Sequence, residues 1–263
     1  ARIARDLARP RVLTFDMGGT TTDVCLIVDG AAEMTDTRMM GGRPLRQPML
    51  AVHSIGAGGG SIVDLGPGGL TVGPKSAGAV PGPACYGRGG TRATITDANL
   101  LLGRLPAAAL PAVFGPTGDQ PADGEAVRER FGALASASGL APEQVAEGAL
   151  WVAIERMAAA IRRISIERGH DIRGALLVSY GGAGGQHACR LAEQLGIRRV
   201  LLHPLSGVLS AYGIGMAEQR QLRERAVRQP LTLALVAELG QAVAELAEQA
   251  AQAVLKAAAE GAV

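Results

Sequence analysis

Residues 12–24 read VLTFDMGGTTTDV, and this stretch decides how the fold begins. A short apolar run ends at Asp16, two glycines follow, and a second apolar run begins at Val24. Apolar runs on both sides of a glycine turn are typical of a β-hairpin. We therefore expect two antiparallel strands joined by a tight turn at Gly18 and Gly19.

The expected turn carries groups that suit phosphate. Successive backbone N–H groups in such a turn can point together at phosphate oxygens. A carboxylate at the end of the strand can hold Mg²⁺ or orient a water, which makes Asp16 the candidate metal ligand and catalytic carboxylate. The alternative is an ordinary turn in which Asp16 only caps the nearby backbone, through Thr20 or Thr21. The candidate cofactor-binding residues of this first bend are Gly18, Gly19, Thr20, Thr21 and Thr22.

A second glycine run, SYGGAGGQHA, occupies residues 179–188. The apolar residues before it predict a buried strand, and those after it predict a helix. An anion or a nucleotide is suited to the N-terminus of such a helix. The run has neither the Walker GK[ST] ending nor GxGxxG spacing, and close packing of helix on strand would also explain its glycines. The candidate cofactor-binding residues of this second bend are Gly181, Gly182, Gly184 and Gly185.

A third glycine run, HSIGAGGGSI, spans residues 53–62 and begins with His53. A histidine beside a glycine loop can act as a general acid or base, so His53 is the second candidate catalytic residue. The alternative is a histidine that is only hydrogen-bonded. The loop itself either lines a cleft or forms a bulged strand.

Three further side chains have both a functional and a structural interpretation. Thr96 or Asp97 is expected to be the N-cap of a helix over 96–105, and a site role is the alternative for Asp97. His187 either meets a nucleotide or caps its helix. Cys85 would need a neighbour that stabilises its thiolate to be a nucleophile, so we expect a buried structural residue.

The remaining pattern alternates strands with helices and predicts an α/β fold. We treat residues 1–263 as one domain, with a glycine- and proline-rich insertion at 66–124 and a C-terminal helix at 231–263. The apolar stripe of that helix can pack on the domain or pair with a second copy, which makes a homo-oligomer one of the alternatives. The other expected elements are a long helix at 142–168, strands at 175–180 and 199–203, helices at 186–195 and 206–219, and irregular loops at 66–90 and 106–124.

Composition excludes several classes of protein. The 26 basic and 24 acidic side chains nearly balance and only seven residues are aromatic, so we expect no nucleic-acid partner. No apolar run approaches the 18–20 or so residues of a membrane span, so we expect no membrane partner. Three cysteines without CxxC spacing favour neither a disulfide framework nor a zinc site, which is typical of a cytoplasmic protein.

Between residues 16 and 213 the chain carries several long, unusual stretches. Together they resemble the hydantoinase A/5-oxoprolinase family, which includes subunits of ATP-dependent hydantoinases, 5-oxoprolinase and acetone-type carboxylases. The stretches are DMGGTTTDV (16–24), HSIGAGGGSI (53–62), VGPKSAGAVPGPACYGRGG (72–90), TDANLLLGRL (96–105), YGGAGGQHA (180–188) and PLSGVLSAYG (204–213).

The resemblance implies an α/β lobe of the actin-like ATPase (ribonuclease H-like) superfamily, with a mixed sheet and packed helices. In that superfamily two lobes close on a nucleotide, so ATP and Mg²⁺ are the implied cofactors. Residues 16–24 then correspond to the phosphate hairpin of the second lobe, and residues 180–185 to the turn that touches adenosine. We expect the backbone amides after Phe15 and after Tyr180 to converge on a single pocket shaped for a triphosphate. The DxGGTFTD-type hairpin of the first lobe is absent, so we expect a central fragment that lacks its N-terminal lobe.

The resemblance also implies a function. The parent protein is expected to be an ATP-dependent hydrolase that phosphorylates a cyclic amide and so activates ring opening, working with a hydantoinase B-type subunit or domain. The alternatives are an ATP-dependent ketone carboxylase subunit and a nucleotide-binding scaffold without chemistry. Because phosphoryl transfer needs charge clamped from several sides, we expect the isolated chain to have little or no ATPase activity.

Overall fold

The computed structural model describes residues 1–167 and 169–260. The chain divides into two compact units, residues 1–210 and 211–263, which are described separately. The first unit contains all three glycine runs of the sequence. In the second unit the main element is α7 (Leu233–Glu260), which follows a segment without regular structure.

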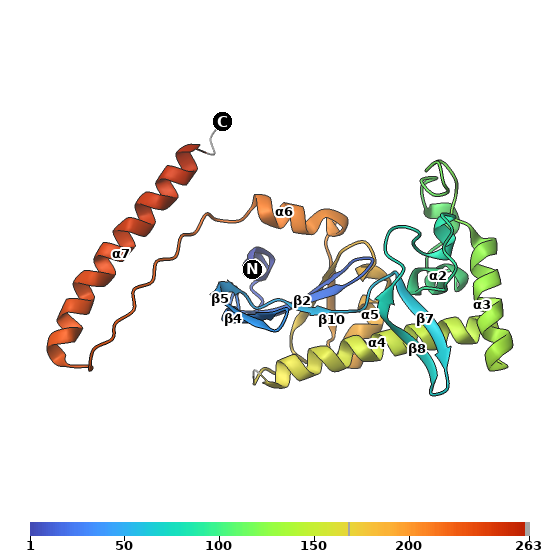
Figure 1. The fold of residues 1–263 in the computed structure, drawn as a ribbon, viewed down its shortest axis with the longest axis horizontal. Coiled ribbons are helices and arrows are strands. Elements are labelled where there is room, and N and C mark those ends of the chain that lie inside the picture. The colour runs from blue at the N-terminus through green and yellow to red at the C-terminus, as the bar shows by residue number, and fades with distance from the viewer. Residues whose placement is uncertain (168, 261–263) are drawn as a thin grey trace. The chain divides into compact units, whose positions relative to one another are not determined.

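A six-stranded mixed sheet forms the centre of the first unit (Figure 1). Its strand order is β10-β9-β1-β2-β3, and β6 also pairs with β2. β1 runs antiparallel to β2 but parallel to β9, and β9 runs parallel to β10. β1, β9 and β10 therefore end at the same edge of the sheet. The strands are β1 (Arg11–Met17), β2 (Thr22–Val28), β3 (Ala31–Ala32), β6 (His53–Ile55), β9 (Leu176–Tyr180) and β10 (Arg199–Leu202).

Alternation along β1 builds a core on each face of the sheet. Phe15 and its same-face neighbours pack against Met157 of α4 (Pro142–Glu167) and Leu191 of α5 (Ala188–Leu195). Val12 faces the other side, where Ala4 of α1 (Arg2–Asp6) and Leu209 at the start of α6 (Leu209–Gly215) are buried. The sheet is thus covered by helices on both faces.

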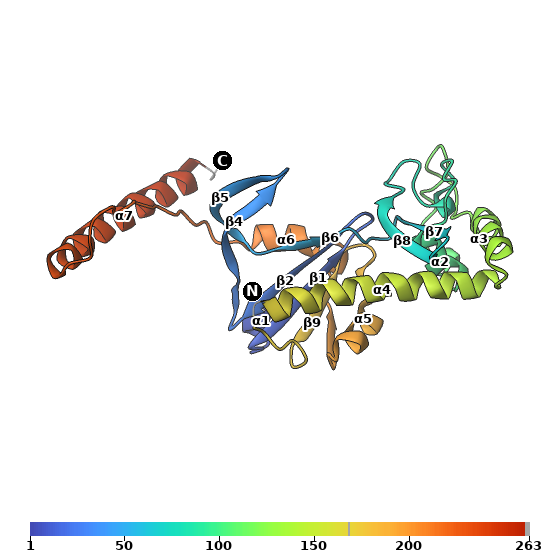
Figure 2. The ribbon, with the colours of Figure 1, turned by 60° about the horizontal axis from the view of Figure 1, so that its bottom comes forward.

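A second body of structure packs on the N-terminal half of α4, beyond the sheet (Figure 2). Its buried residues come from a two-stranded sheet and from helices, and Phe131 is among them with no exposed surface. Its elements are β7 (Ser61–Gly66), β8 (Gly69–Ser76), the short 3-10 turns η1 (Ala84–Tyr86) and η2 (Ala107–Ala109), α2 (Ile95–Leu101) and α3 (Gly124–Ser138). α4 is therefore the common support of the sheet and of this insertion.

Strands β4 (Met34–Met40) and β5 (Arg43–Leu50) form a separate two-stranded hairpin. Its turn is made by Gly41 and Gly42, which both have positive φ angles of 55° and 78°. Two consecutive residues with positive φ are the signature of a type I′ turn, which glycine adopts without strain. Nearly all residues of this hairpin are exposed.

The α/β fold class is confirmed, as are the hairpin at residues 12–24, the strands near 175–180 and 199–203, and the helix from Pro142. α7 begins two residues later than expected. The helix expected over 206–219 is shorter than that range, and β4 and β5 have no counterpart in the sequence prediction. The expected ends of two helices, at 168 and at 261–263, lie outside the described residues.

The prediction of an irregular loop over 66–90 is wrong in part, because β8 occupies Gly69–Ser76. The many glycines and prolines of this stretch hide a strand that pairs only with its neighbour β7. The helix expected at 96–105 begins at Ile95, and its N-cap is Thr94 instead of Thr96 or Asp97. Asp97 is the third residue of that helix and completes a capping box with Thr94.

Within the described residues, no helix is long and apolar enough to cross a membrane.

Replacement of Phe131 by alanine is expected to lower the free energy of unfolding by about 3–5 kcal/mol, because it leaves a cavity between α3 and α4. Urea denaturation followed by circular dichroism measures this loss. The matched control is Leu140→Ala. The side chain of Leu140 is 52% exposed, so this substitution should lower the free energy of unfolding by less than about 1 kcal/mol. Equal losses in the two variants would contradict this core.

Candidate functional site

The first and second glycine bends lie side by side at one edge of the sheet. Parallel pairing of β1 with β9 places Asp16 opposite Tyr180, so the chain enters both bends from neighbouring positions. The amide of Ala183 then donates to the carbonyl of Met17 at 2.9 Å and joins the second bend to the first. This confirms that segments more than 160 residues apart in the sequence meet in space.

The first bend is held from behind by the third glycine run. The amide of Gly18 closes the turn on the carbonyl of Thr21 at 3.0 Å, while Gly59 and Gly60 donate to the carbonyls of Gly18 and Gly19 at 3.0 and 2.6 Å. A Cβ on Gly58 would lie 2.6 Å from the amide nitrogen of Thr20, so only glycine allows this close approach. The third run therefore packs against the hairpin and supports it.

Three successive amides at the tip of the first bend are available to a ligand. Gly19, Thr20 and Thr21 are exposed. Across residues 1–167 and 169–260, their backbone N–H groups have no hydrogen-bond acceptor. Nothing lies within 4 Å of the position that a Cβ of Gly19 would take. Adjacent free N–H groups on an open surface are suited to an anion.

The glycines of the second bend fall into two pairs. Gly181 has a φ of 82° and Gly184 lies against Ser179, so both are packed inside the bend. Gly182 and Gly185 are exposed and have open space beside them. Their amides also have no acceptor in the part of the chain that the structure describes. The second bend therefore presents two further donors at the same edge of the sheet.

The carboxylate of Asp16 lies where the two bends meet. Its Oδ1 would be 2.5 Å from a Cβ on Gly181, and its Oδ2 accepts a hydrogen bond of 2.9 Å from the hydroxyl of Ser210. The backbone-capping interpretation named Thr20 and Thr21, but the side chain that Asp16 contacts is Ser210. Sequence reasoning missed Ser210, although it belongs to the stretch PLSGVLSAYG at 204–213.

The threonines of the first bend differ in orientation. Thr22 is fully buried and its hydroxyl donates to the carbonyl of Ala57 at 2.7 Å, so it ties the hairpin to the third glycine run. Thr20 and Thr21 are exposed at the tip of the bend. Of the three hydroxyls, only these two are open to solvent.

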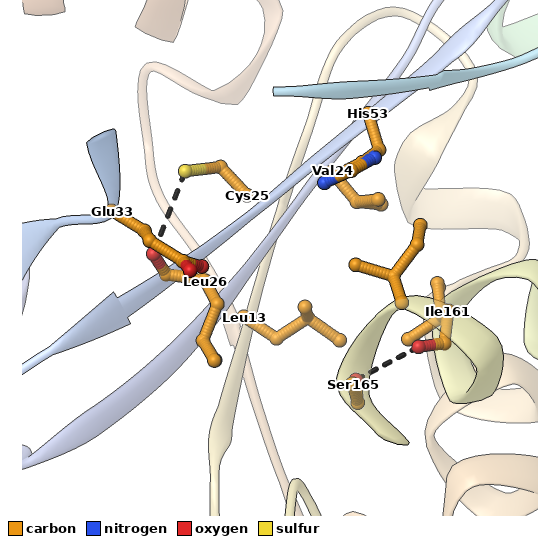
Figure 3. Close-up of a pocket in the computed structure, with 9 residues that line it drawn as sticks. Leu13, Val24, Cys25, Leu26, Glu33, His53, Ile161 and Ser165 are labelled. Carbon is orange, nitrogen blue, oxygen red and sulfur yellow. Dashed lines mark hydrogen bonds between the residues drawn. The ribbon is translucent and has the colours of Figure 1, made fainter. Parts of the chain in front are cut away.

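His53 lies apart from the group formed by Asp16 and the two bends. It starts β6, pairs with Val24, and lines a small cavity together with Leu13, Ile161 and Ser165 (Figure 3). The cavity has a volume of about 10 Å³, which is close to the space of one water molecule. Its lining includes neither Asp16 nor a residue of either bend.

His187 follows the second bend and is almost completely buried. Its Nε2 lies 3.3 Å from the side-chain amide nitrogen of Asn99 on α2. Burial is the main cause that lowers its pKa from 6.5 to about 4, and the charges of Arg104 and Arg190 add to the shift. The ring is therefore neutral at pH 7 and contacts the interior of the protein, which favours a structural role over direct contact with a ligand.

Asp97 and Cys85 act together as structural residues. The buried carboxylate of Asp97 accepts hydrogen bonds from the amides of Ala84 and Cys85, at 3.1 and 2.8 Å, besides those from Thr94. Burial first, and the negative charge of Asp97 second, raise the pKa of the Cys85 thiol well above its ordinary value. A buried thiol held in its protonated form is a poor nucleophile.

The donor set at the two bends fits the phosphates of a nucleotide better than it fits a metal ion alone. No group of three or more His, Cys, Asp and Glu side chains that could hold a metal occurs within residues 1–167 and 169–260. Asp16 is one carboxylate beside a hydroxyl and five free amides. A Mg²⁺ ion at this place would take most of its oxygen ligands from phosphate and water, which is its usual preference.

Residues 1–223 match the model of the hydantoinase/oxoprolinase family. The chain belongs to this family. It is 46% identical over 213 residues to the 5-oxoprolinase PfmaA of Pestalotiopsis fici, which covers 79% of this chain and 16% of that protein. It is 38% identical over 250 residues to the caprolactamase subunit alpha of Pseudomonas jessenii, which covers 94% of this chain and 35% of that subunit.

Two solved structures share the fold. The ATP-dependent caprolactamase of Pseudomonas jessenii superposes with a TM-score of 0.76 at 36% identity, over 94% of this chain and 36% of that chain. The nucleotide-free acetone carboxylase superposes with the same TM-score of 0.76 at 27% identity, over 95% of this chain and 36% of that one. The mixed sheet with helices on both faces is consistent with an actin-like ATPase lobe. This family member spans about a sixth of the length of 5-oxoprolinase PfmaA.

The buried neutral His187 predicts a specific dependence of stability on pH. Its pKa is lower in the folded state than in the unfolded chain, so the unfolded chain binds more protons between pH 4 and 6.5. The contribution of the neutral His187 to the free energy of unfolding is complete above about pH 6.5. It is lost as the pH falls towards 4, and the total loss is at most about 3 kcal/mol. Urea denaturation at a series of pH values measures it.

The control for this titration is His187→Gln, which keeps a hydrogen-bonding side chain but does not titrate. The difference in unfolding free energy between the native chain and this variant should shrink or reverse between pH 6.5 and 4. A difference that stays constant over this interval would show that His187 is not held neutral.

Proposed function

We propose that the two bends bind the phosphates of ATP. The observation that carries this proposal is the set of unpaired, exposed amides at one edge of the sheet. They belong to Gly19, Thr20 and Thr21 in the first bend and to Gly182 and Gly185 in the second. The other predicted cofactor-binding residues, Gly18, Thr22, Gly181 and Gly184, shape the bends that present them.

Asp16 is the proposed residue for Mg²⁺. Its carboxylate lies between the two bends, and the hydroxyl of Ser210 fixes its orientation by donating to Oδ2. The bound nucleotide supplies a transferable phosphoryl group, and Mg²⁺ neutralises its negative charge. The part of this chain is to bind and orient: free amides for phosphate oxygens, and a carboxylate aimed at the metal.

We further propose that the parent protein uses ATP to open a cyclic amide. Phosphorylation of the amide oxygen makes the ring carbon a better electrophile for water. The family profile and the relatives called 5-oxoprolinase and caprolactamase support this substrate class. The acetone carboxylase structure supports the alternative of a ketone carboxylase, but at 27% identity it is less similar than the caprolactamase at 36%.

The rest of the machinery is proposed to lie outside this chain. A lobe preceding it would close on the nucleotide from the other side, and a hydantoinase B-type subunit or domain would provide further parts of the reaction. A catalytic role for His53 and a cytoplasmic location remain predictions. The cytoplasmic location is supported by Cys25, Cys85 and Cys189, none of which forms a disulfide within the residues that the structure describes.

Titration calorimetry of the 263-residue chain with Mg²⁺ and ATP tests the proposal. Gly19→Ala and Gly182→Ala should each weaken binding about tenfold, because each adds a methyl group where phosphate would approach an amide. Asp16→Asn should weaken binding only when Mg²⁺ is present. Neither glycine has positive φ or a neighbour within 4 Å of its Cβ position, so the fold should tolerate both substitutions.

Gly174→Ala is the matched control. Gly174 also has an open Cβ position, but it lies before β9, at the opposite end of that strand from the second bend. The affinity of the Gly174→Ala variant for ATP should equal that of the native chain. Equal affinity in all four variants, or no binding by the native chain, would remove the two bends from nucleotide binding.

A further inference from the structure

One short helix of the insertion is connected to both bends through hydrogen bonds. α2 contributes Thr96, whose amide and hydroxyl donate to the carbonyl of Gly59 at 2.7 and 2.9 Å. The amide of Gly59 donates in turn to the carbonyl of Gly18 in the first bend at 3.0 Å. Two hydrogen bonds in series therefore connect α2 to the hairpin tip.

Asn99 connects the same helix to the second bend. It lies three residues after Thr96, and residues at this spacing share one face of a helix. Its side-chain amide contacts Nε2 of His187 at 3.3 Å, and both side chains are buried. The backbone amide of His187 donates to the carbonyl of Gly184 at 3.1 Å, so the main chain of this residue is bonded to the second bend itself.

With the Asn99 amide oriented as in the structure, its nitrogen faces Nε2 of His187, and this contact requires an unprotonated Nε2. An amide N–H can donate to Nε2 only when this nitrogen is unprotonated, and in the reverse orientation of the amide Oδ1 would accept from Nε2–H. The charged groups nearby are Arg104 and Arg190, which both pair with Glu147, at 2.5 and 2.6 Å. Because Glu147 is already shared by two arginines, the surroundings of His187 favour its neutral form.

The contacts form a closed ring around the two bends. On the side of the sheet, Ala183 donates to Met17 and joins the bends directly. On the side of the insertion, Thr96 and Asn99 join them through α2. A Cβ on Gly59 would lie 3.6 Å from the Cβ of Ala183, so the third glycine run also touches the second bend. The spacing of the bends is therefore fixed from two directions.

We propose that Thr96 and Asn99 are positioning residues that hold the two bends at the separation a nucleotide requires. The statement about the nucleotide rests on the proposed function, whereas the bracing of the bends does not. Asp97, between these residues, has a different role, because its carboxylate holds the amides of Ala84 and Cys85 and thereby stabilises the insertion. The stretch TDAN at 96–99 thus combines two links to the bends, through Gly59 and His187, with one set of contacts inside the insertion.

Hydrogen exchange of the 263-residue chain without nucleotide tests the bracing. Thr96→Val and Asn99→Leu should accelerate exchange of the bonded amides that hold the bends, those of Gly18 and Gly59 in the first case and Gly181 and Ala183 in the second. An acceleration of about three- to tenfold corresponds to the loss of one hydrogen bond. Thr96→Ser keeps the hydroxyl and should restore the native rates.

Ser165→Ala is the matched control, because this buried hydroxyl donates to the carbonyl of Ile161 in its own helix. It should leave exchange in the bends unchanged. If Thr96→Val and Asn99→Leu also leave these rates at the control level, the bracing is refuted, even if both variants melt at a lower temperature. Should Asn99→Leu fail to fold, Thr96→Val and its serine counterpart decide the question.

Calorimetry with Mg²⁺ and ATP on the same variants separates the two proposals. Binding by the native chain that is weakened about three- to tenfold in Thr96→Val, and restored in Thr96→Ser, supports positioning for a nucleotide. Native binding that is unchanged in the variants refutes it. If the native chain does not bind ATP but the variants exchange faster, the role in nucleotide binding is refuted and the bracing of the two bends by α2 is supported.

Discussion

The parallel pairing of β1 with β9 is the constraint on which the candidate site depends. Because the two strands run parallel, with Asp16 opposite Tyr180, the chain leaves both strands at the same edge of the sheet. Neither bend could present its amides beside the other without this pairing. A shift of one residue would also turn Phe15 and Leu177 out of the core, so burial of these side chains fixes the register.

Glycine has three different roles around this edge. In the third run, Gly58 and Gly60 allow one backbone to approach another more closely than any side chain would permit. In the second bend, Gly181 adopts a positive φ and packs against Asp16. Only Gly19, Gly182 and Gly185 combine open space with unpaired amides among the bend glycines that the structure describes. The glycine-rich stretches are thus mainly a rigid support for a few exposed donors.

The sequence predicted features that depend on short, local patterns. The hairpin at 12–24, the strand before Gly181 and the long helix from Pro142 follow from apolar runs and turn residues. Contacts between distant residues left no such pattern: the bond of Asp16 to Ser210 spans 194 residues, and that of Asn99 to His187 spans 88. The strand β8 was missed because its glycines and proline are typical of a loop. By contrast, the spacing of Thr94 and Asp97 is that of a capping box and could have been read from the sequence.

The central claim is that the two bends form one phosphate site, and an NMR titration tests it most directly. The 263-residue chain, labelled with ¹⁵N, would be titrated with Mg²⁺ and a non-hydrolysable ATP analogue. We expect the amide signals of Gly19, Thr20 and Thr21 to move together with those of Gly182 and Gly185, all with the same midpoint. Movement of the signals of one bend alone, or separate midpoints for the two bends, would contradict a single site.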